Sequence, residues 1–213
     1  MSDALHVTPR DHAIVQALVQ KVRLFSQRQI VDHWWSGELA NSRRRLKRLA
    51  DHNLIQRSFV MARPAPAFES PLVTWQPGDA APDFGKIAYR CQARWRSRPA
   101  RQCVVWLATK AASQAFGGTA RGELKHPTQA THDLGVAAVW LRLQQVAPQW
   151  AAAWRGEDVL AHTRKGQKLP DAFIVDAADQ VIWVIEFGGS YDAERVKAFH
   201  QDCVSRNLPY QLW

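Results

Sequence analysis

The stretch that decides how the second half of the chain folds is 169-LPDAFIVDAADQVIWVIEFGG-189. Residues 171–176 and 181–187 are rich in β-branched and aromatic side chains, and the turn-forming residues 177–180 lie between them. This pattern predicts a β-hairpin with a four-residue loop.

The register of this hairpin decides where two carboxylates lie. If Asp176 pairs with Val181 across the loop, Asp171 lies directly opposite Glu186 on one face. Like charges opposite each other destabilise an antiparallel pair unless a cation, a basic side chain or a shared proton compensates. A functional acidic pair is one interpretation of this pattern. A frayed hairpin end with both acids solvated, or a register shifted by one residue, is the alternative.

The composition describes an ordinary globular chain. Its 213 residues are 46% hydrophobic and 22% charged, which suits one large or two small domains. No apolar run approaches the roughly 18 residues of a membrane span, and no signal peptide opens the chain. Three cysteines without metal-binding spacing favour a reducing compartment. We expect a cytoplasmic protein with no membrane partner.

The positive charge is confined to the front of the chain. Residues 1–76 carry 11 basic and six acidic side chains, residues 77–130 carry nine and three, and residues 131–213 carry eight and ten. A polyanion partner for the front part, most simply nucleic acid, follows from this distribution. A surface that only confers solubility is the alternative.

The first 76 residues predict a winged helix-turn-helix domain. Thr8 and Pro9 begin a helix that runs to about Val22, and Ser26 with Gln29 forms a capping box for a second helix ending near Trp35. A third helix follows in residues 41–53, with Ser42 as its N-cap and Asn53 in the left-handed conformation at its end. Two strand-like runs, residues 54–61 and 72–76, then predict the β-ribbon.

The third helix carries the predicted DNA-binding surface. Leu46, Leu49 and Ala50 define its buried side, so that its basic side chains point outward. Such a helix fits the major groove of double-stranded DNA. A solvated basic face, or a winged helix used only for protein contacts, is the alternative. The candidate DNA-binding residues are Arg43, Arg44, Arg45, Lys47 and Arg48, with Arg63 at the ribbon tip and Arg94 and Arg96 further on.

Residues 77–130 read as a basic connector. Between Lys86 and Arg101, basic residues alternate with Tyr89 and Trp95, a composition that suits a surface following phosphates. A charged linker helix is the alternative. Residues 102–108 predict a strand and residues 109–116 a short helix.

Residues 131–213 predict the order helix, three strands, helix, strand. The helices are expected at 132–146 and 192–206, and the strands at 154–160, in the two arms of the hairpin and at 209–213. With Pro170 and Asp171 opening the second strand and Glu186 late in the third, this order resembles the restriction-endonuclease-like fold and its PD-(D/E)xK motif. The overall expectation is an α+β or α/β chain with a winged helix-turn-helix domain and an α-β-β-β-α-β nuclease-like domain.

The upstream sequence extends the resemblance. The basic connector, "HDLGVAAVWLRL" at residues 132–143, "PDAFIV" and "IEF" together are similar to the replication-relaxation family of bacterial plasmids and other mobile elements. That resemblance implies a role in replication control, mobilisation or transcription of such an element.

In active nucleases of the fold, two acids hold a divalent metal and a lysine two residues after the second acid assists the reaction. The resemblance assigns catalysis and metal binding to Asp171 and Glu186, with Mg²⁺ or Mn²⁺ as the metal. Gly188 stands where the lysine is expected, and Gly135, Ala137 and Ala138 leave the opening helix without an inward glutamate. The candidates for a relocated basic group are Lys197, Arg195, Lys165 and Lys168, and His132, His162 and His200 are further candidates.

Three functions are therefore weighed. The preferred one is a DNA-binding protein that needs no cofactor, in which the nuclease-like domain has lost catalysis and serves architecture, dimerisation as a homodimer, or partner contact. The second is a Mg²⁺- or Mn²⁺-dependent DNA endonuclease. The third is a protein-interaction adaptor without nucleic-acid contacts.

Overall fold

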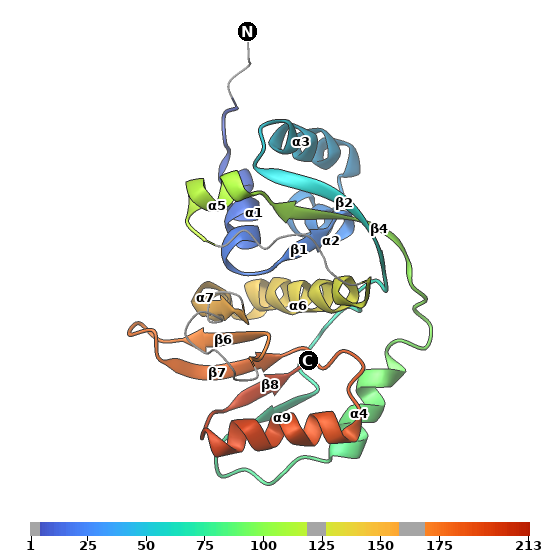
Figure 1. The fold of residues 1–213 in the computed structure, drawn as a ribbon, viewed down its shortest axis with the longest axis vertical. Coiled ribbons are helices and arrows are strands. Elements are labelled where there is room, and N and C mark those ends of the chain that lie inside the picture. Colours follow the sequence, from blue (N-terminus) through green and yellow to red (C-terminus); the bar gives the residue numbers. More distant parts are fainter. Residues whose placement is uncertain (1–4, 119–126, 158–168) are drawn as a thin grey trace. The chain divides into compact units, whose positions relative to one another are not determined.

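The protein has a mixed α+β fold with two open sheets, which confirms the broad fold class (Figure 1). It is described here from a computed structural model covering residues 5–118, 127–157 and 169–213. No helix in these ranges is long and apolar enough to cross a membrane.

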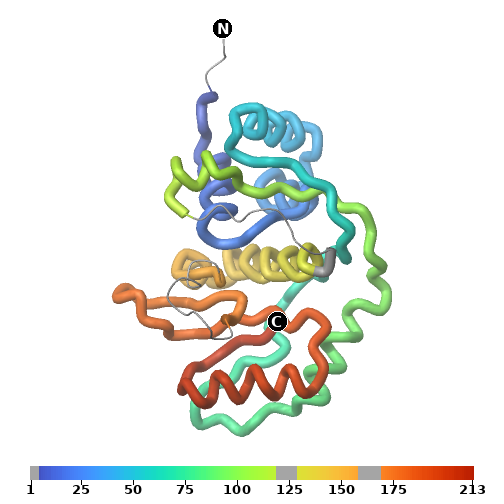
Figure 2. The backbone as a smooth tube through the Cα atoms, viewed as in Figure 1, coloured from blue at the N-terminus to red at the C-terminus, as the bar shows by residue number. Residues whose placement is uncertain are grey.

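The chain divides into two compact units, and each is assembled from separated segments. The first contains the chain up to Ala62 together with Arg101–Ala137, and the second contains Arg63–Ala100 together with Ala138–Trp213. The expected blocks 1–76, 77–130 and 131–213 are continuous, whereas these units are not. Figure 2 lets the reader follow the chain as it leaves the first unit after Ala62 and returns to it at Arg101.

The first unit combines helices with a three-stranded antiparallel sheet in the order β1-β4-β2. The side chains that form its centre, such as Ile14, Leu18 and Val105, are fully buried. Its elements are α1 (Pro9–Gln20), β1 (Leu24–Ser26), α2 (Gln27–Trp35), α3 (Leu39–Asp51), β2 (Ile55–Ala62), β4 (Arg101–Ala108), α5 (Lys110–Phe116) and the first part of α6 (Pro127–Val146).

Local capping chemistry sets the ends of α1 and α2 as expected. Thr8 caps α1 and exchanges hydrogen bonds with Asp11, and Pro9 occupies the first turn. Ser26 and Gln29 form the predicted capping box at α2. Each box satisfies amide groups that the first helical turn leaves without a partner inside the helix. Asn53 has the predicted positive φ, of 56°.

The predicted N-cap of α3 is wrong. The helix begins at Leu39, with Glu38 at the N-cap position and no side-chain cap, and the Ser42 hydroxyl donates back to the Leu39 carbonyl at 2.8 Å. The reason is the turn before it: Ser36 and Gly37 both take positive φ, which ends α2 and lets α3 start without a long loop.

The predicted ribbon between residues 54–61 and 72–76 is also wrong. Strand β2 pairs along its full length with β4, from Ile55 opposite Ala108 to Ala62 opposite Arg101. Strand β3 (Val73–Trp75) pairs instead with β8 in the other sheet. Residues 105–108 of β4 are buried, and β4 is as long as β2, whereas β3 has only three residues.

The second unit contains a five-stranded sheet in the order β3-β8-β7-β6-β5. Strands β7 and β8 are parallel and the other pairs are antiparallel. Figure 1 shows α4 and α9 on one side of this sheet, where they enclose a core with Phe173 and Val184. The remaining elements are α4 (Phe84–Ala93), the second part of α6, α7 (Pro148–Ala153), β5 (Trp154–Gly156), β6 (Ala172–Val175), β7 (Val181–Glu186), α9 (Ala193–Ser205) and β8 (Tyr210–Leu212).

The hairpin of β6 and β7 has the predicted register except near its loop. Ala172, Phe173 and Ile174 pair with the expected partners, but a bulge follows and Val175, not Asp176, lies opposite Val181. Asp176 is in the turn, where its carboxylate accepts hydrogen bonds from the amides of residues 178 and 180. That local bonding favours a longer loop than the predicted four residues.

Candidate functional site

The outward side of α3 is a basic surface. Arg43, Arg44, Lys47 and Arg48 are exposed, whereas Leu46 and Leu49 on the opposite side are fully buried. We call these four cations the α3 basic face. Lys47 forms an ion pair with Asp51 one turn further along, at 2.7 Å, so part of its charge is compensated within the helix.

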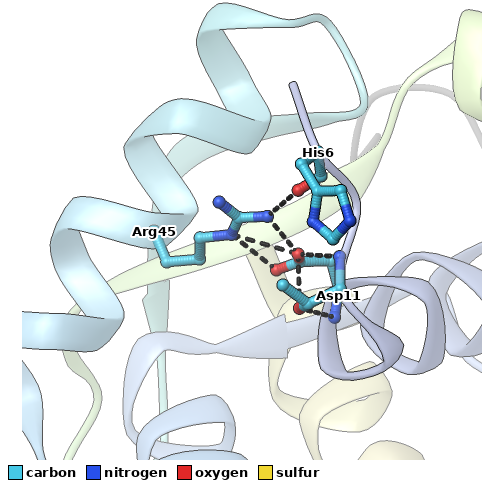
Figure 3. Close-up of polar contacts among 4 residues, drawn as sticks. His6, Asp11 and Arg45 are labelled. Carbon is cyan, nitrogen blue, oxygen red and sulfur yellow. Dashed lines mark hydrogen bonds and ion pairs between the residues drawn. The ribbon is translucent and has the colours of Figure 1, made fainter. Parts of the chain in front are cut away.

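Arg45 lies on the same helix but is engaged inside the unit (Figure 3). Its guanidinium donates to both carboxylate oxygens of Asp11 and to the backbone oxygen of His6, the latter at 2.6 Å. The Asp11 side chain is fully buried, which opposes its ionisation, but the hydrogen bonds from Arg45 and Thr8 outweigh burial and lower its pKa. Arg45 therefore ties α3 to the start of α1.

The other predicted DNA-binding cations belong to the second unit and lie in three different environments. Arg63 is exposed, with its guanidinium 5.9 Å from the centre of the Trp95 ring. Arg94 is partly buried, donates to the backbone oxygen of Trp213 at 3.0 Å, and has its pKa lowered by burial. Arg96 is exposed and covers the ring of Tyr89 at 5.1 Å.

The structure brings Asp171 and Glu186 together, as the register predicts. The Asp171 amide donates to Glu186 Oε2 at 3.1 Å, and the Phe187 amide donates to Asp171 Oδ2 at 2.7 Å. Glu186 is only 3% exposed, while Asp171 is half-buried. Each carboxylate thus accepts a backbone amide beside the other acid, which offsets the repulsion between them.

Tyr191 completes this cluster. Its hydroxyl donates to Glu186 Oε1. Burial and the nearby Glu186 charge both raise the pKa of Tyr191, so that the phenol stays protonated and continues to donate. Asp171, Glu186 and Tyr191 form what we call the acidic cluster.

Gly188 faces a filled space. A Cβ atom on this residue would lie 2.9 Å from the Cys91 sulfur and 3.0 Å from Leu212 Cδ2. Its amide also donates to the backbone oxygen of Trp213 at 3.0 Å. Any side chain at this position would therefore have to displace the side chains of Cys91 and Leu212.

The candidates for a relocated basic group have different surroundings. Lys197 is exposed on α9. Arg195 lies near Tyr191, with its guanidinium 6.0 Å from the ring, and its charge acts to lower the tyrosine pKa. Lys165, Lys168 and His162 lie outside the described residues.

The acidic cluster does not fit a resident divalent metal in this arrangement. Both Glu186 oxygens already accept hydrogen bonds, from Tyr191 and from the Asp171 amide, and one Asp171 oxygen accepts from Phe187. In residues 5–118, 127–157 and 169–213, no group of three or more His, Cys, Asp or Glu side chains could hold a metal ion. Hard cations such as Mg²⁺ need several oxygen ligands or waters around them.

Two of these features escaped the sequence analysis. Tyr191 follows Gly188 and Gly189 and directly precedes the N-cap residue Asp192, so the sequence indicates its place in a turn. The sequence gives no signal for its hydrogen bond to Glu186. Asp11 was visible as the third residue of α1, where a carboxylate commonly completes a capping box. Its second bond, to an arginine 34 residues away, carries no local signal.

No protein-family model, curated protein or solved structure matches this chain.

Proposed function

We propose that the protein binds double-stranded DNA through its first unit, which folds as a winged helix-turn-helix. The order α1-β1-α2-α3-β2-β4 and the three-residue connection between α2 and α3 support this assignment. In that arrangement α3 is the helix that enters the major groove. Strands β2 and β4 then form the wing, and the segment from Arg63 to Ala100 is inserted at its tip.

The observation that carries the proposal is the α3 basic face. Its four cations are exposed on the side away from Leu46 and Leu49, while Arg45, which is half-buried and bonded to Asp11, fastens the helix to α1. A rigid helix with cations on one side can neutralise several phosphates at once, and its position on the duplex is fixed by those contacts. We therefore assign DNA contact to Arg43, Arg44, Lys47 and Arg48, and a positioning role to Arg45.

For the second unit we propose a nuclease-like domain without catalysis. In the described residues the order is α6-α7-β5-β6-β7-α9-β8, with β8 parallel to β7, and this order supports the restriction-endonuclease-like assignment. The closed space at Gly188 and the hydrogen bonds that occupy Glu186 support the loss of activity. Such a domain serves architecture, a homodimer contact or a protein partner.

The resemblance to the replication-relaxation family suggests the biological setting. On that basis we assign the protein to replication, mobilisation or transcription control of a bacterial plasmid or mobile element. The α3 basic face supports DNA binding in any of these roles, because its phosphate contacts do not depend on which process the DNA serves.

A metal-dependent endonuclease is the second candidate, and the proximity of Asp171 and Glu186 favours it. If Mg²⁺ or Mn²⁺ binds there, these carboxylates are the residues that would hold it, and the metal would supply Lewis-acid activation of a phosphate. Tyr191 would have to release Glu186, because its hydroxyl donates to one of the oxygens that face the site.

A binding titration on a fluorescent duplex tests the DNA-binding proposal. Changing Arg43, Arg44 and Arg48 together to Gln is expected to weaken binding tenfold or more. It should also reduce the slope of log K against log salt by about 2 to 3, because each phosphate contact contributes about 0.9. Arg28→Gln is the matched control, since Arg28 is exposed on α2 but paired with Asp32 at 2.7 Å. Unchanged binding in the triple variant would leave the protein-interaction adaptor as the better reading.

A cleavage assay on supercoiled plasmid separates the two candidates for the second unit. We expect binding without nicking in Mg²⁺ or Mn²⁺. Nicking that both Asp171→Asn and Glu186→Gln abolish would establish the endonuclease instead, and Lys197→Ala would then test whether Lys197 supplies the missing basic group.

A further inference from the structure

We propose that the exposed side of α4, in the second unit, binds single-stranded nucleic acid, with Tyr89 as the surface on which an unpaired base stacks. This surface differs from the α3 basic face in its location and in the form of nucleic acid that it recognises. It goes beyond the proposed duplex binding and does not depend on it.

The geometry of α4 separates a buried side from a polar one. Ile87, Ala88 and Cys91 are buried against the sheet and α9. Lys86, Tyr89 and Arg90 are exposed. Because residues three and four apart are neighbours on a helix, Tyr89 and Arg90 both lie beside Lys86.

Arg96 adds a third exposed cation to this surface. Its guanidinium lies 5.1 Å from the centre of the Tyr89 ring, a distance at which cation and ring attract each other. Lys86, Tyr89, Arg90 and Arg96 are called the α4 face. Arg90 also donates to the backbone oxygen of Leu72 at 3.2 Å, which holds its side chain in place on the surface.

The charged side chains of the segment that carries the α4 face all have one sign. Residues 84–101 contain six basic side chains and no acidic one, so no carboxylate within this segment competes for the cations. The nearest acid along the chain, Asp83, is the N-cap of α4 and accepts from the Lys86 amide at 2.9 Å. A negatively charged chain of phosphates complements this surface.

Tyr89 is the feature that points to unpaired bases. It is 59% exposed, more than any other large hydrophobic side chain in the described residues. Duplex DNA buries the faces of its bases in the stack and shows proteins only their edges. An aromatic ring bordered by cations, in contrast, is the arrangement that binds single strands, since phosphates meet the cations while a base stacks on the ring.

The first unit supplies a matched control. Phe59 on β2 is 56% exposed and has the Arg57 guanidinium 4.7 Å from its ring. It therefore has the exposure and the cation–ring contact of Tyr89, but it belongs to the other unit. If exposure and one arginine were sufficient for base stacking, the two residues would behave alike.

The test is a fluorescence anisotropy titration of the full chain with labelled 20-nucleotide oligo-dT and oligo-U, compared with a labelled duplex. Tyr89→Ala should weaken single-strand binding by about tenfold, the order expected for losing one stacked base. Tyr89→Phe should stay within about twofold of the wild type, and Phe59→Ala should have no effect. Changing Lys86, Arg90 and Arg96 together to Gln should lower the single-strand salt slope by about 2. The two oligonucleotides distinguish DNA from RNA.

Three results would overturn the proposal. They are an unchanged affinity in Tyr89→Ala, an equal loss in Phe59→Ala, or displacement of oligo-dT by polyglutamate at matched charge, which would indicate a surface for acidic proteins. Failure of the duplex proposal is separate, because the three arginine substitutions on α3 should weaken duplex binding and leave the effect of Tyr89→Ala on oligo-dT intact.

Discussion

Asp11 is a carboxylate with no exposed surface, and its ionisation is favoured by the neighbouring Thr8 and by the distant Arg45. The bonds from Arg45 and Thr8 lower its pKa below the ordinary value of 3.8 in spite of burial. Because the folded-state pKa is the lower one, the stabilisation is present above the unfolded pKa and is lost as the pH falls through the folded value.

We predict that Asp11→Asn lowers the free energy of unfolding by about 2–3 kcal/mol at pH 7, since removing one partner leaves the other charge uncompensated. Urea denaturation measures the change, and the difference from the wild type should shrink below about pH 4. Asp32→Asn is the control because its exposed pair with Arg28 should contribute about 0.5 kcal/mol or less. Equal losses in the two variants would contradict the role given to burial.

At Gly188 the neighbouring side chains leave no room for a larger residue. Gly188→Ala should destabilise the protein by about 1–3 kcal/mol, because the new methyl group overlaps Cys91 and Leu212. The control is Gly85→Ala on α4, where the nearest atom to the added Cβ is at an ordinary 3.4 Å. Thermal or urea unfolding compares the two, and an unchanged stability in Gly188→Ala would show that the neighbours move aside easily.

The residues that the sequence could predict are those whose partners are local or follow from strand alternation. The sequence predicts that Asp171 and Glu186 lie together, because side chains alternate along a strand and the cross-strand partners follow from the position of the nearby loop. Helical periodicity places Arg45 near the outer face of α3 and so predicts DNA contact. The periodicity of one helix carries no information about Asp11, its partner on α1. Tyr191 was missed for the same reason.

At the scale of elements, helix α2 is defined by chemistry at both ends. Ser26→Ala removes the capping hydroxyl and should cost about 1 kcal/mol. Ser36→Gly at the other end should act in the opposite direction and stabilise by about 0.5 kcal/mol, since Ser36 has a φ of 47° that glycine adopts without strain. Chemical denaturation of both variants gives the signs. Two losses of similar size would mean that packing, not the caps, sets the stability of α2.

Strand partners were harder to predict than helix ends. The run at residues 54–61 predicts a strand, and its proximity in sequence to the run at residues 72–76 predicts the wrong partner for it. The true partner, β4, begins at Arg101, and its burial beside α1 and α2 depends on the finished unit. Which strands pair depends on contacts between distant segments, so the β-propensity of either strand alone does not predict its partner.

At the scale of the whole molecule, the first unit depends on β4. In the order β1-β4-β2, the strands β1 and β2 do not pair with each other, so a fragment of residues 1–76 lacks the middle of its sheet. We predict that this fragment is unfolded by circular dichroism and by amide exchange.

A shortened chain tests the same point in the other direction. Ala62 and Arg101 are paired across β2 and β4, so an Asn-Gly turn can join residues 1–62 to residues 101–137 as a two-residue hairpin loop. This variant should fold cooperatively and bind duplex DNA. A folded 1–76 fragment, or an unfolded joined chain, would contradict the division into units.

The late arrival of β4 also has a consequence during synthesis. At about 5–20 residues per second, a ribosome needs on the order of a few seconds to pass from the end of β2 to the end of β4. Throughout that interval β2 is a nascent strand whose partner in the sheet has not yet been made, so its backbone N–H and C=O groups have no strand to pair with. When several ribosomes translate one messenger RNA, β2 strands of neighbouring nascent chains are therefore most able to pair wrongly with one another.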